Sequence, residues 1–167
     1  SLCARRPRLC IIREGIMTDT RVITFSELST DPMWPSLIEG YAEECAMEGL
    51  PPVNCQYAIY QQLCDAGALH ILGAYHDDEL CGFVIMLIHV APHYGVTIAA
   101  TESFFVALDK RATGAGLVLL RSAERYAEDK GAEGFLVSAP TGGRLEQVLL
   151  KSSSYTERNR VFIKELS

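Results

Sequence analysis

The chain has 167 residues, the length of one ordinary domain that can bury a core of its own. Hydrophobic residues make up 49% and charged residues 22%, which is typical of soluble globular proteins and excludes a disordered chain. The net charge of −6 argues against general binding to nucleic acid or to an anionic membrane, because those partners need a basic face. No apolar run approaches the roughly 20 residues that span a bilayer.

The cysteines are scattered and show no metal-binding spacing. The six are Cys3, Cys10, Cys45, Cys55, Cys64 and Cys81. Since no pair stands as C-x-x-C and no histidine pair has zinc-ligand spacing, we expect no metal site. An even count would allow disulfides, but reduced and mostly buried thiols fit a chain of this size better, so we expect a cytoplasmic protein.

The first 16 residues carry four arginines around a proline, and their apolar residues are too few to form a signal-peptide core. The run Met17-Thr18-Asp19-Thr20 resembles an ordinary start. We therefore expect residues 1–16 to be an N-terminal extension, disordered or foreign to the native protein, and residues 17–167 to be one domain. The alternative is a basic arm that binds a partner.

The first half of that domain alternates between short apolar runs and helical patterns. A helix is expected to begin at Thr30-Asp31-Pro32, with its apolar face running to Cys45. The remaining elements expected are a strand over Val22–Phe25, a helix over Gln56–Ala66, and strands over Leu69–Tyr75 and Leu80–Ala91. The near-continuous apolar character of the last two strands predicts a sheet covered on both faces.

The stretch from Thr101 to Gly116, TESFFVALDKRATGAG, is the most informative part of the chain. Strand alternation from Thr101 to Val106 leads into R-x-x-G-x-G at Arg111–Gly116, and an amphipathic helix follows over Leu117–Lys130. Glycines let an anion approach the backbone closely, and the first amides of a helix favour negative charge. This junction therefore predicts a phosphate-binding turn, with Arg111 as a positive charge beside it.

This segment resembles the acetyl-CoA signature of the GNAT superfamily of N-acetyltransferases, whose core reads Q/R-x-x-G-x-G/A after a strand. The resemblance implies an α/β fold with a central mixed, mostly antiparallel twisted sheet flanked by helices. It also implies that acetyl-CoA (CoA) binds here, with strand amides holding the pantetheine arm and the turn holding the diphosphate. The cofactor-binding residues it implies are Phe104, Phe105, Val106, Arg111, Ala112, Thr113, Gly114, Ala115 and Gly116.

Pro92-His93-Tyr94 ahead of Glu102-Ser103-Phe104-Phe105 resembles a variant of this superfamily that is frequent in bacteriophage genomes. In such proteins the region before the sheet covers the acceptor site. Trp34, Tyr41, Tyr57 and Tyr60 are therefore candidates for lining it, with Tyr94 from the later loop, although aromatic residues here are also ordinary core filler. His93 is a candidate for proton relay, and a solvated loop histidine is the alternative.

The rest of the chain is expected to complete the fold with a strand at Phe135–Val137, a short helix at Leu145–Lys151 and a closing strand at Val161–Leu166. Here the sequence departs from the family. Counted back from Tyr155, the position where many members carry a tyrosine that protonates the CoA thiolate is Leu150, and leucine cannot donate a proton. Tyr155 or a hydroxyl of Ser152–Ser154 could serve instead.

For the chemistry, Glu102 is the carboxylate expected to take the proton of the acceptor ammonium or to bind a cationic acceptor, because it lies on the strand ahead of the turn, on the same face as Val106. A carboxylate at the rim of the site with no catalytic part is the alternative. Backbone amides near Phe105 and Val106 could polarise the thioester carbonyl. The predicted enzyme moves an acetyl group to a primary amine, on a small cationic molecule or a protein, by direct attack in a ternary complex. A non-catalytic CoA-binding or protein-interaction module on the same fold is the alternative, and a homodimer is possible.

Overall fold

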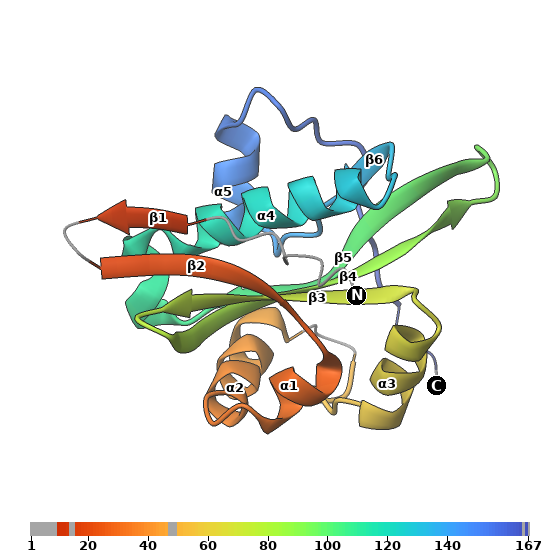
Figure 1. Cartoon of the computed structure of the whole chain (residues 1–167). Helices are drawn as coiled ribbons and strands as arrows, with labels where there is room; N and C mark the ends of the chain where they lie inside the picture. The colour runs from red at the N-terminus through yellow and green to blue at the C-terminus, as the bar shows by residue number, and fades with distance from the viewer. Residues whose placement is uncertain (1–9, 14–15, 47–49, 165, 167) are drawn as a thin grey trace, which may run out of the picture.

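The computed structural model describes residues 10–13, 16–46, 50–164 and 166. These residues form one sheet with strands in the order β1-β2-β3-β4-β5-β6, covered by α1, α2 and α3 on one face and by α4 and α5 on the other (Figure 1). The strands are β1 (Cys10–Arg13), β2 (Ile16–Ile23), β3 (Leu69–His76), β4 (Glu79–Ala91), β5 (Val96–Val106) and β6 (Gly134–Leu136). The helices are α1 (Phe25–Thr30), α2 (Trp34–Cys45), α3 (Tyr57–Asp65), the 3-10 helix η1 (Leu108–Thr113), α4 (Ala115–Asp129) and α5 (Arg144–Lys151).

Neighbouring strands are antiparallel except for β5 and β6, which pair in parallel. The expected mixed, mostly antiparallel sheet flanked by helices is thus confirmed. In the part of the chain that the structure describes, no helix is long and apolar enough to cross a membrane.

The core lies on both sides of β4. Phe83 packs with Trp34, Leu37 and the other buried residues under α1 and α2, whereas its neighbour Val84 packs with Leu119 and the rest of the α4 face. Phe83 and Val84 are both fully buried, so successive residues of β4 enter opposite apolar layers. This confirms the prediction from the apolar character of the strand that the sheet is covered on both faces.

Strand β5 carries a β-bulge at Glu102. The residue opposite Ile85 on β4 is Ser103, but the residue opposite Met86 is Thr101, so Glu102 has no partner of its own on β4. An extra residue in one strand bends it and re-aims its side chain. Because of this bulge, the alternation of side chains along β5 changes phase between Thr101 and Ser103.

Strand β6 pairs with β5 over three residues only, ending at Leu136 opposite Ala100. Beyond that point the amide of Ser138 donates to Thr101 Oγ1 at 2.9 Å, and the chain then leaves the sheet toward α5. The second half of β5, from Thr101 to Val106, therefore has no neighbouring strand on the β6 side within the described residues. That unpaired edge is where a cavity opens.

Two stretches in the N-terminal part of the chain differ from the sequence expectation. Part of the expected N-terminal extension belongs to the sheet, since β1 pairs with β2 and Ile16 is the first residue of β2; residues 1–9, 14 and 15 lie outside the described part. Phe25 was expected to end a strand but begins α1, because Thr24 and Glu27 form a capping box there: Thr24 Oγ1 accepts from the Glu27 amide and the Glu27 carboxylate accepts from the Thr24 amide.

The expected closing strand at Val161–Leu166 is wrong for its described residues, which have no regular secondary structure. Val161 and Phe162 are 90% and 89% exposed. Their β-branched and aromatic character favours a strand only when a neighbouring strand supplies hydrogen bonds and a surface to pack on. No such pairing is present among the described residues.

Candidate functional site

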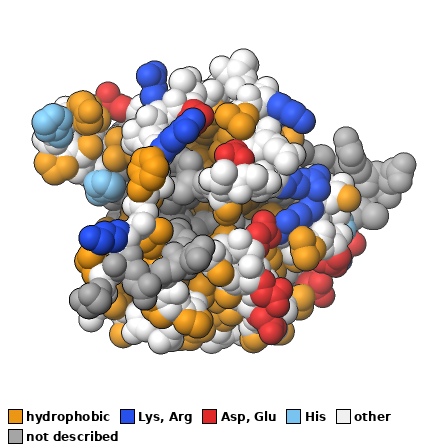
Figure 2. All heavy atoms as spheres, turned by 180° about the vertical axis from the view of Figure 1, so that it is seen from behind, with side chains coloured by type: hydrophobic (Ala, Val, Ile, Leu, Met, Phe, Trp, Pro, Cys, Tyr) orange, Lys and Arg blue, Asp and Glu red, His pale blue; other side chains and the backbone are white. Residues whose placement is uncertain are grey.

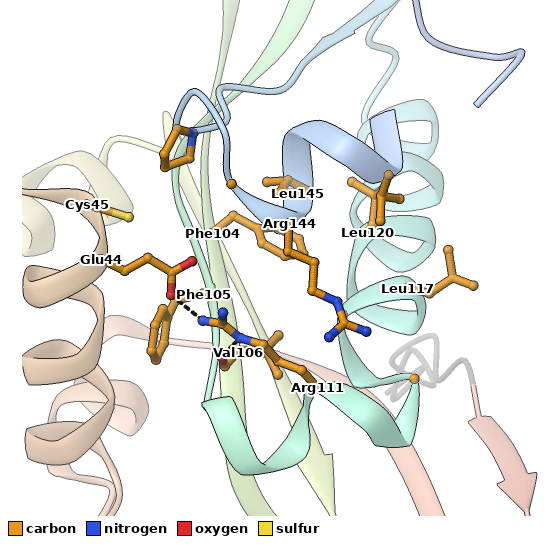
Figure 3. Close-up of a pocket in the computed structure, with 15 residues that line it drawn as sticks. Glu44, Cys45, Phe104, Phe105, Val106, Arg111, Leu117, Leu120, Arg144 and Leu145 are labelled. Atoms are coloured by element: carbon orange, nitrogen blue, oxygen red, sulfur yellow. Dashed lines mark hydrogen bonds and ion pairs between the residues drawn. The ribbon is translucent and has the colours of Figure 1, made fainter. Parts of the chain in front are cut away.

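A cavity of about 250 Å³ lies beside the unpaired half of β5 and is closed by the end of α2, the start of α4 and the segment leading into α5 (Figure 3). We call it the β5–α4 pocket. Its lining residues are Glu44, Cys45, Phe104, Phe105, Val106, Arg111, Gly114, Gly116, Leu117, Leu120, Pro140, Gly143, Arg144, Leu145 and Val148. The wall is mostly apolar, and the charged side chains Glu44, Arg111 and Arg144 come from three different elements.

The turn from β5 into α4 has the geometry that the sequence predicted. Gly114 has φ +88°, in the left-handed region that favours glycine. It is the N-cap residue of α4 and has no side chain to cap the helix. A Cβ at Gly114 would meet no atom within 4 Å, and one at Gly116 would meet only Val106 at 3.8 Å, so both positions face open space. The first amides of α4 therefore stand at an unobstructed edge of the pocket.

Of the nine residues predicted to bind the cofactor, six line this pocket: Phe104, Phe105, Val106, Arg111, Gly114 and Gly116. Ala112, Thr113 and Ala115 are outside its lining. Ala115 is fully buried against the sheet, and the Thr113 hydroxyl donates to the Lys110 carbonyl and accepts from the Ala115 amide. These three residues shape the turn and do not face the cavity.

Arg111, which the sequence predicted as a positive charge beside the turn, is held in place by three contacts. Its Nε donates to the Val106 carbonyl at 2.9 Å, and a terminal nitrogen forms an ion pair with Glu44 at the end of α2. Its guanidinium also lies 5.5 Å from the centre of the Phe105 ring. Arg111 thus fastens η1 to β5 and α2, and Glu44 offsets much of its charge.

Arg144, the first residue of α5, was not selected from the sequence. It lines the pocket, and Figure 3 shows its side chain reaching from α5 toward the opening turn of α4. Sequence reasoning took this region for a loop followed by an apolar helix face. The available signal was an arginine directly after Gly142-Gly143, at a helix N-terminus where a cation is electrostatically unfavourable.

Glu102 lies beside this pocket on the face of the sheet covered by α2 and α3. Tyr60 of α3 donates a hydrogen bond from its hydroxyl to Glu102 Oε1 at 2.8 Å. The sequence prediction placed Glu102 on the face of Val106, but Val106 packs against α4 while Tyr60 packs on the opposite core. The bulge at Glu102 is the reason, because it shifts the alternation by one residue.

The Glu102 carboxylate acts on two neighbouring tyrosines. The pKa values of Tyr41 and Tyr60 are raised, mainly by burial and then by the negative charge of Glu102. Both phenols therefore stay protonated at neutral pH. Tyr41 packs edge-on against Phe105, at 6.3 Å between ring centres, so it connects Glu102 to a residue that lines the β5–α4 pocket.

The other predicted acceptor-site residues lie elsewhere. Trp34 is 3% exposed and packs on Phe83, so it belongs to the core, and its indole N–H donates to the Tyr57 hydroxyl at 2.9 Å. Tyr57 is partly exposed at the start of α3. Tyr94 is 78% exposed at the far end of the β4–β5 hairpin. The alternative interpretation of Trp34 as core filler is therefore correct.

His93 also lies at the tip of that hairpin, stacked edge-on against Tyr94. The hairpin projects beyond the sheet in Figure 1, and the projecting corner in Figure 2 carries histidine and hydrophobic side chains. From Val96 to Glu102 the strand extends about 20 Å, at 3.3–3.4 Å per residue. The structure therefore does not bring His93 and Tyr94 together with Glu102.

Tyr155, the candidate proton donor, contacts α4 and not the pocket. Its hydroxyl donates to Glu124 Oε1, and burial together with that carboxylate raises its pKa. Neither residue lines the β5–α4 pocket. The hydroxyl is thus occupied by the hydrogen bond that fastens the segment after α5 onto α4.

Among the described residues no group of three or more histidine, cysteine, aspartate or glutamate side chains could hold a metal ion. Cys45, Cys55, Cys64 and Cys81 are free thiols. Burial raises the pKa of each, and that of Cys81 reaches about 11, so these thiols are weak nucleophiles at neutral pH.

Solved structures with the same fold are acetyltransferases. A ribosomal-protein-alanine N-acetyltransferase from Brucella melitensis biovar Abortus 2308 is 18% identical, with a TM-score of 0.67 over 88% of this chain and 98% of that one. The aminoglycoside acetyltransferase meta-AAC0020 from an uncultured soil metagenomic sample, in complex with sisomicin, is 15% identical, with a TM-score of 0.68 over 90% and 97%. The aminoglycoside N-acetyltransferase AAC(6')-Iy in complex with CoA is 18% identical, with a TM-score of 0.67 over 92% and 97%.

At these identities the structural similarity establishes the fold alone. No curated protein sequence matches the chain. The family model of the acetyltransferase (GNAT) family, however, matches residues 33–142, which run from the start of α2 to the loop after β6 and include the whole turn at Arg111–Gly116. The chain therefore belongs to the GNAT acetyltransferase family and is an N-acetyltransferase with the fold of that family.

Proposed function

We propose that the protein transfers the acetyl group of acetyl-CoA to a cationic primary amine by direct attack in a ternary complex. The observation that carries this proposal is the position of Glu102. A bulge turns its carboxylate toward Tyr60, next to Phe105 of the β5–α4 pocket. A proton acceptor thus lies beside the place that suits a thioester cofactor.

The residues of the pocket fit CoA. The apolar residues of β5 and α4 suit the pantetheine arm, and the open glycine turn suits the diphosphate. The strand edge past Ala100 has no paired neighbour among the described residues, which leaves its backbone groups available to an extended arm. When bound there, acetyl-CoA supplies an activated acyl group whose thiolate is a tolerable leaving group.

The chain's own contribution is positioning and proton transfer. Glu102 accepts a proton from the acceptor ammonium, directly or through a water molecule, since only the neutral amine is nucleophilic. Tyr60 fixes the orientation of that carboxylate through its hydrogen bond. The Ser103 hydroxyl is buried and has no hydrogen-bond partner among the described residues, so it can accept or donate one bond to a bound substrate or water.

The acceptor class follows from the same groups. The Glu102 carboxylate, which accepts a hydrogen bond from Tyr60, attracts a cationic acceptor through its negative charge. The similar structures include an aminoglycoside N-acetyltransferase and a ribosomal-protein-alanine N-acetyltransferase, so both a small molecule and a polypeptide are candidate carriers of the amine. The bacteriophage origin and the cytoplasmic location expected from the sequence stay predictions.

A direct assay tests this function. The protein is incubated with acetyl-CoA and a panel of polyamines, aminoglycosides and peptides with a free N-terminus or lysine, and thiol release is followed with a colorimetric reagent. We expect release that depends on one amine class and follows sequential, not ping-pong, kinetics. Tight CoA binding without release for any amine would instead support the non-catalytic module.

A further inference from the structure

We infer that Arg144, and not the Arg111 of the glycine-rich turn, is the arginine that binds the phosphates of the cofactor. This inference rests on the proposed function, because it assumes that CoA occupies the β5–α4 pocket. The pocket lining holds these two guanidinium groups as its cations. They differ in how far each is already engaged.

Arg111 is engaged at both ends of its guanidinium. It donates to the Val106 carbonyl, pairs with Glu44, and lies over the Phe105 ring, and its side chain is 18% exposed. A phosphate that approaches it meets Glu44, a carboxylate that itself lines the pocket and repels anions. The Glu44–Arg111 pair is therefore close to neutral toward an incoming phosphate.

Arg144 is in the opposite situation. The residue is exposed, and its guanidinium makes no hydrogen bond or ion pair with any described residue. The acidic side chain of its own helix, Glu146, accepts a hydrogen bond from the Gly142 amide at 2.6 Å. The charge of Arg144 is thus fully available to a ligand.

The position of Arg144 also lacks a structural explanation. As the first residue of α5 it stands at the positive end of the helix dipole, where a cation is unfavourable. An anion between α5 and the start of α4 would remove this conflict, because it would face the Arg144 guanidinium and the positive end of the α4 dipole together. Figure 3 shows the side chain directed into that space.

The test compares ligands with and without phosphate. Calorimetry measures binding of CoA, dephospho-CoA and pantetheine to the wild-type chain, to Arg144→Gln and to Arg144→Lys. We expect Arg144→Gln to weaken CoA binding about 10- to 100-fold, as for loss of a charge-assisted hydrogen-bonded pair, and to leave pantetheine binding within twofold. Arg144→Lys should restore part of the loss, and dephospho-CoA shows which phosphate is bound.

Arg121→Gln is the matched control, since it removes an exposed arginine of α4 that does not line the pocket. It should leave CoA binding within twofold, and the dependence of CoA affinity on salt should fall for Arg144→Gln only. If Arg144→Gln binds CoA as the wild type does, the inference is wrong while the proposed function stands. If the wild-type chain binds no CoA, both are wrong.

Discussion

Glu102 acquires its position from a single extra residue in β5. Without the bulge, even spacing from Val106 would turn its carboxylate toward α4; with it, the carboxylate meets the Tyr60 hydroxyl on the α3 side. The β-bulge, a local irregularity of the sheet, therefore determines which face of the sheet the Glu102 carboxylate lies on. This makes Glu102 the side chain whose replacement is most informative.

Glu102→Gln keeps the shape of the side chain and removes its capacity to accept a proton. We expect kcat/KM for the acceptor amine at neutral pH to fall by about 10²- to 10⁴-fold, the usual contribution of a positioned acid or base. Steady-state kinetics between pH 6 and 10 check this. The rate of the variant should rise with pH as the amine loses its own proton in solution.

Glu128→Gln makes the same charge change on the exposed side of α4 and should leave the rate unaltered. Tyr60→Phe removes only the hydrogen bond to Glu102, so a smaller, several-fold loss is expected. A Glu102→Gln enzyme within twofold of the wild type would show that the carboxylate is a bystander at the rim of the site.

His70 gives the stability a pH dependence. Its pKa is lowered from the ordinary value of 6.5, mainly by burial, while its ring nitrogens bond to Tyr126 and to the Gly67 carbonyl. The folded chain therefore binds fewer protons than the unfolded chain below about pH 6.5. The contribution of His70 is complete above pH 6.5 and is lost as the pH falls toward its folded-state pKa.

Urea unfolding at pH 7.5 and pH 5.5 measures this effect. We expect the free energy of unfolding of the wild type to be lower at pH 5.5, and we expect His70→Gln to show a smaller difference between the two pH values. His93→Gln, at the exposed tip of the hairpin, is the control and should behave as the wild type. An unchanged pH dependence in His70→Gln would contradict the assignment.

Among the elements, β5 lines the pocket and packs closely against both α2 and β4. Two glycines let them approach closely: a Cβ at Gly40 of α2 would lie 2.8 Å from the Phe105 ring, and one at Gly82 of β4 would lie 2.7 Å from the Phe105 carbonyl. The ring of Phe105 can move, but the carbonyl belongs to the backbone of β5. Gly82 is thus the less tolerant position.

Gly82→Ala should force β4 away from β5 and destabilise the fold by about 1–3 kcal/mol, the usual penalty for overpacking. For a chain of this length that lowers Tm by about 3–10 °C. Gly134→Ala is the matched change in β6, where the new Cβ would make an ordinary contact of 3.7 Å with Ile98. Thermal unfolding of both variants compares them, and equal Tm values would contradict the packing argument.

The sequence predicted most elements because their signals are local. Periodicity and turn chemistry predicted the strand before the glycine turn and the helix after it, and these are β5 and α4 in the structure. The apolar run of β4 likewise predicted that both of its faces are buried. The bulge at Glu102, the ion pair between Arg111 and Glu44, and the contact of Tyr155 with Glu124 depend on residues far apart in sequence. Arg144 belongs to this second group, since its proposed role depends on a pocket lined by five elements, α2, β5, η1, α4 and α5.

At the scale of the molecule, one sheet separates two layers that the proposed reaction needs together. Helices α1 to α3 lie on the side of Glu102, and α4 with α5 on the side of the glycine turn, while β5 joins the two (Figure 1). A ligand in the β5–α4 pocket would contact α2, β5, α4 and α5 at once. Binding should therefore stabilise the whole domain and not one element.

CoA at 100 times its Kd should stabilise the folded chain by about 2.7 kcal/mol. For a domain of this size we expect Tm to rise by about 5–10 °C. Thermal unfolding with increasing CoA checks this, and pantetheine, which lacks the phosphates, should give a smaller shift at the same concentration. A Tm that is independent of CoA would contradict binding to the folded chain.

The most direct test of the account is a crystal structure with acetyl-CoA. We predict a diphosphate at the Gly114–Gly116 turn within reach of Arg144, a pantetheine arm along β5 past Phe105, and the acetyl group on the side of Glu102. A cofactor bound elsewhere, or a β5–α4 pocket filled by the chain's own side chains in the presence of saturating acetyl-CoA, would contradict it.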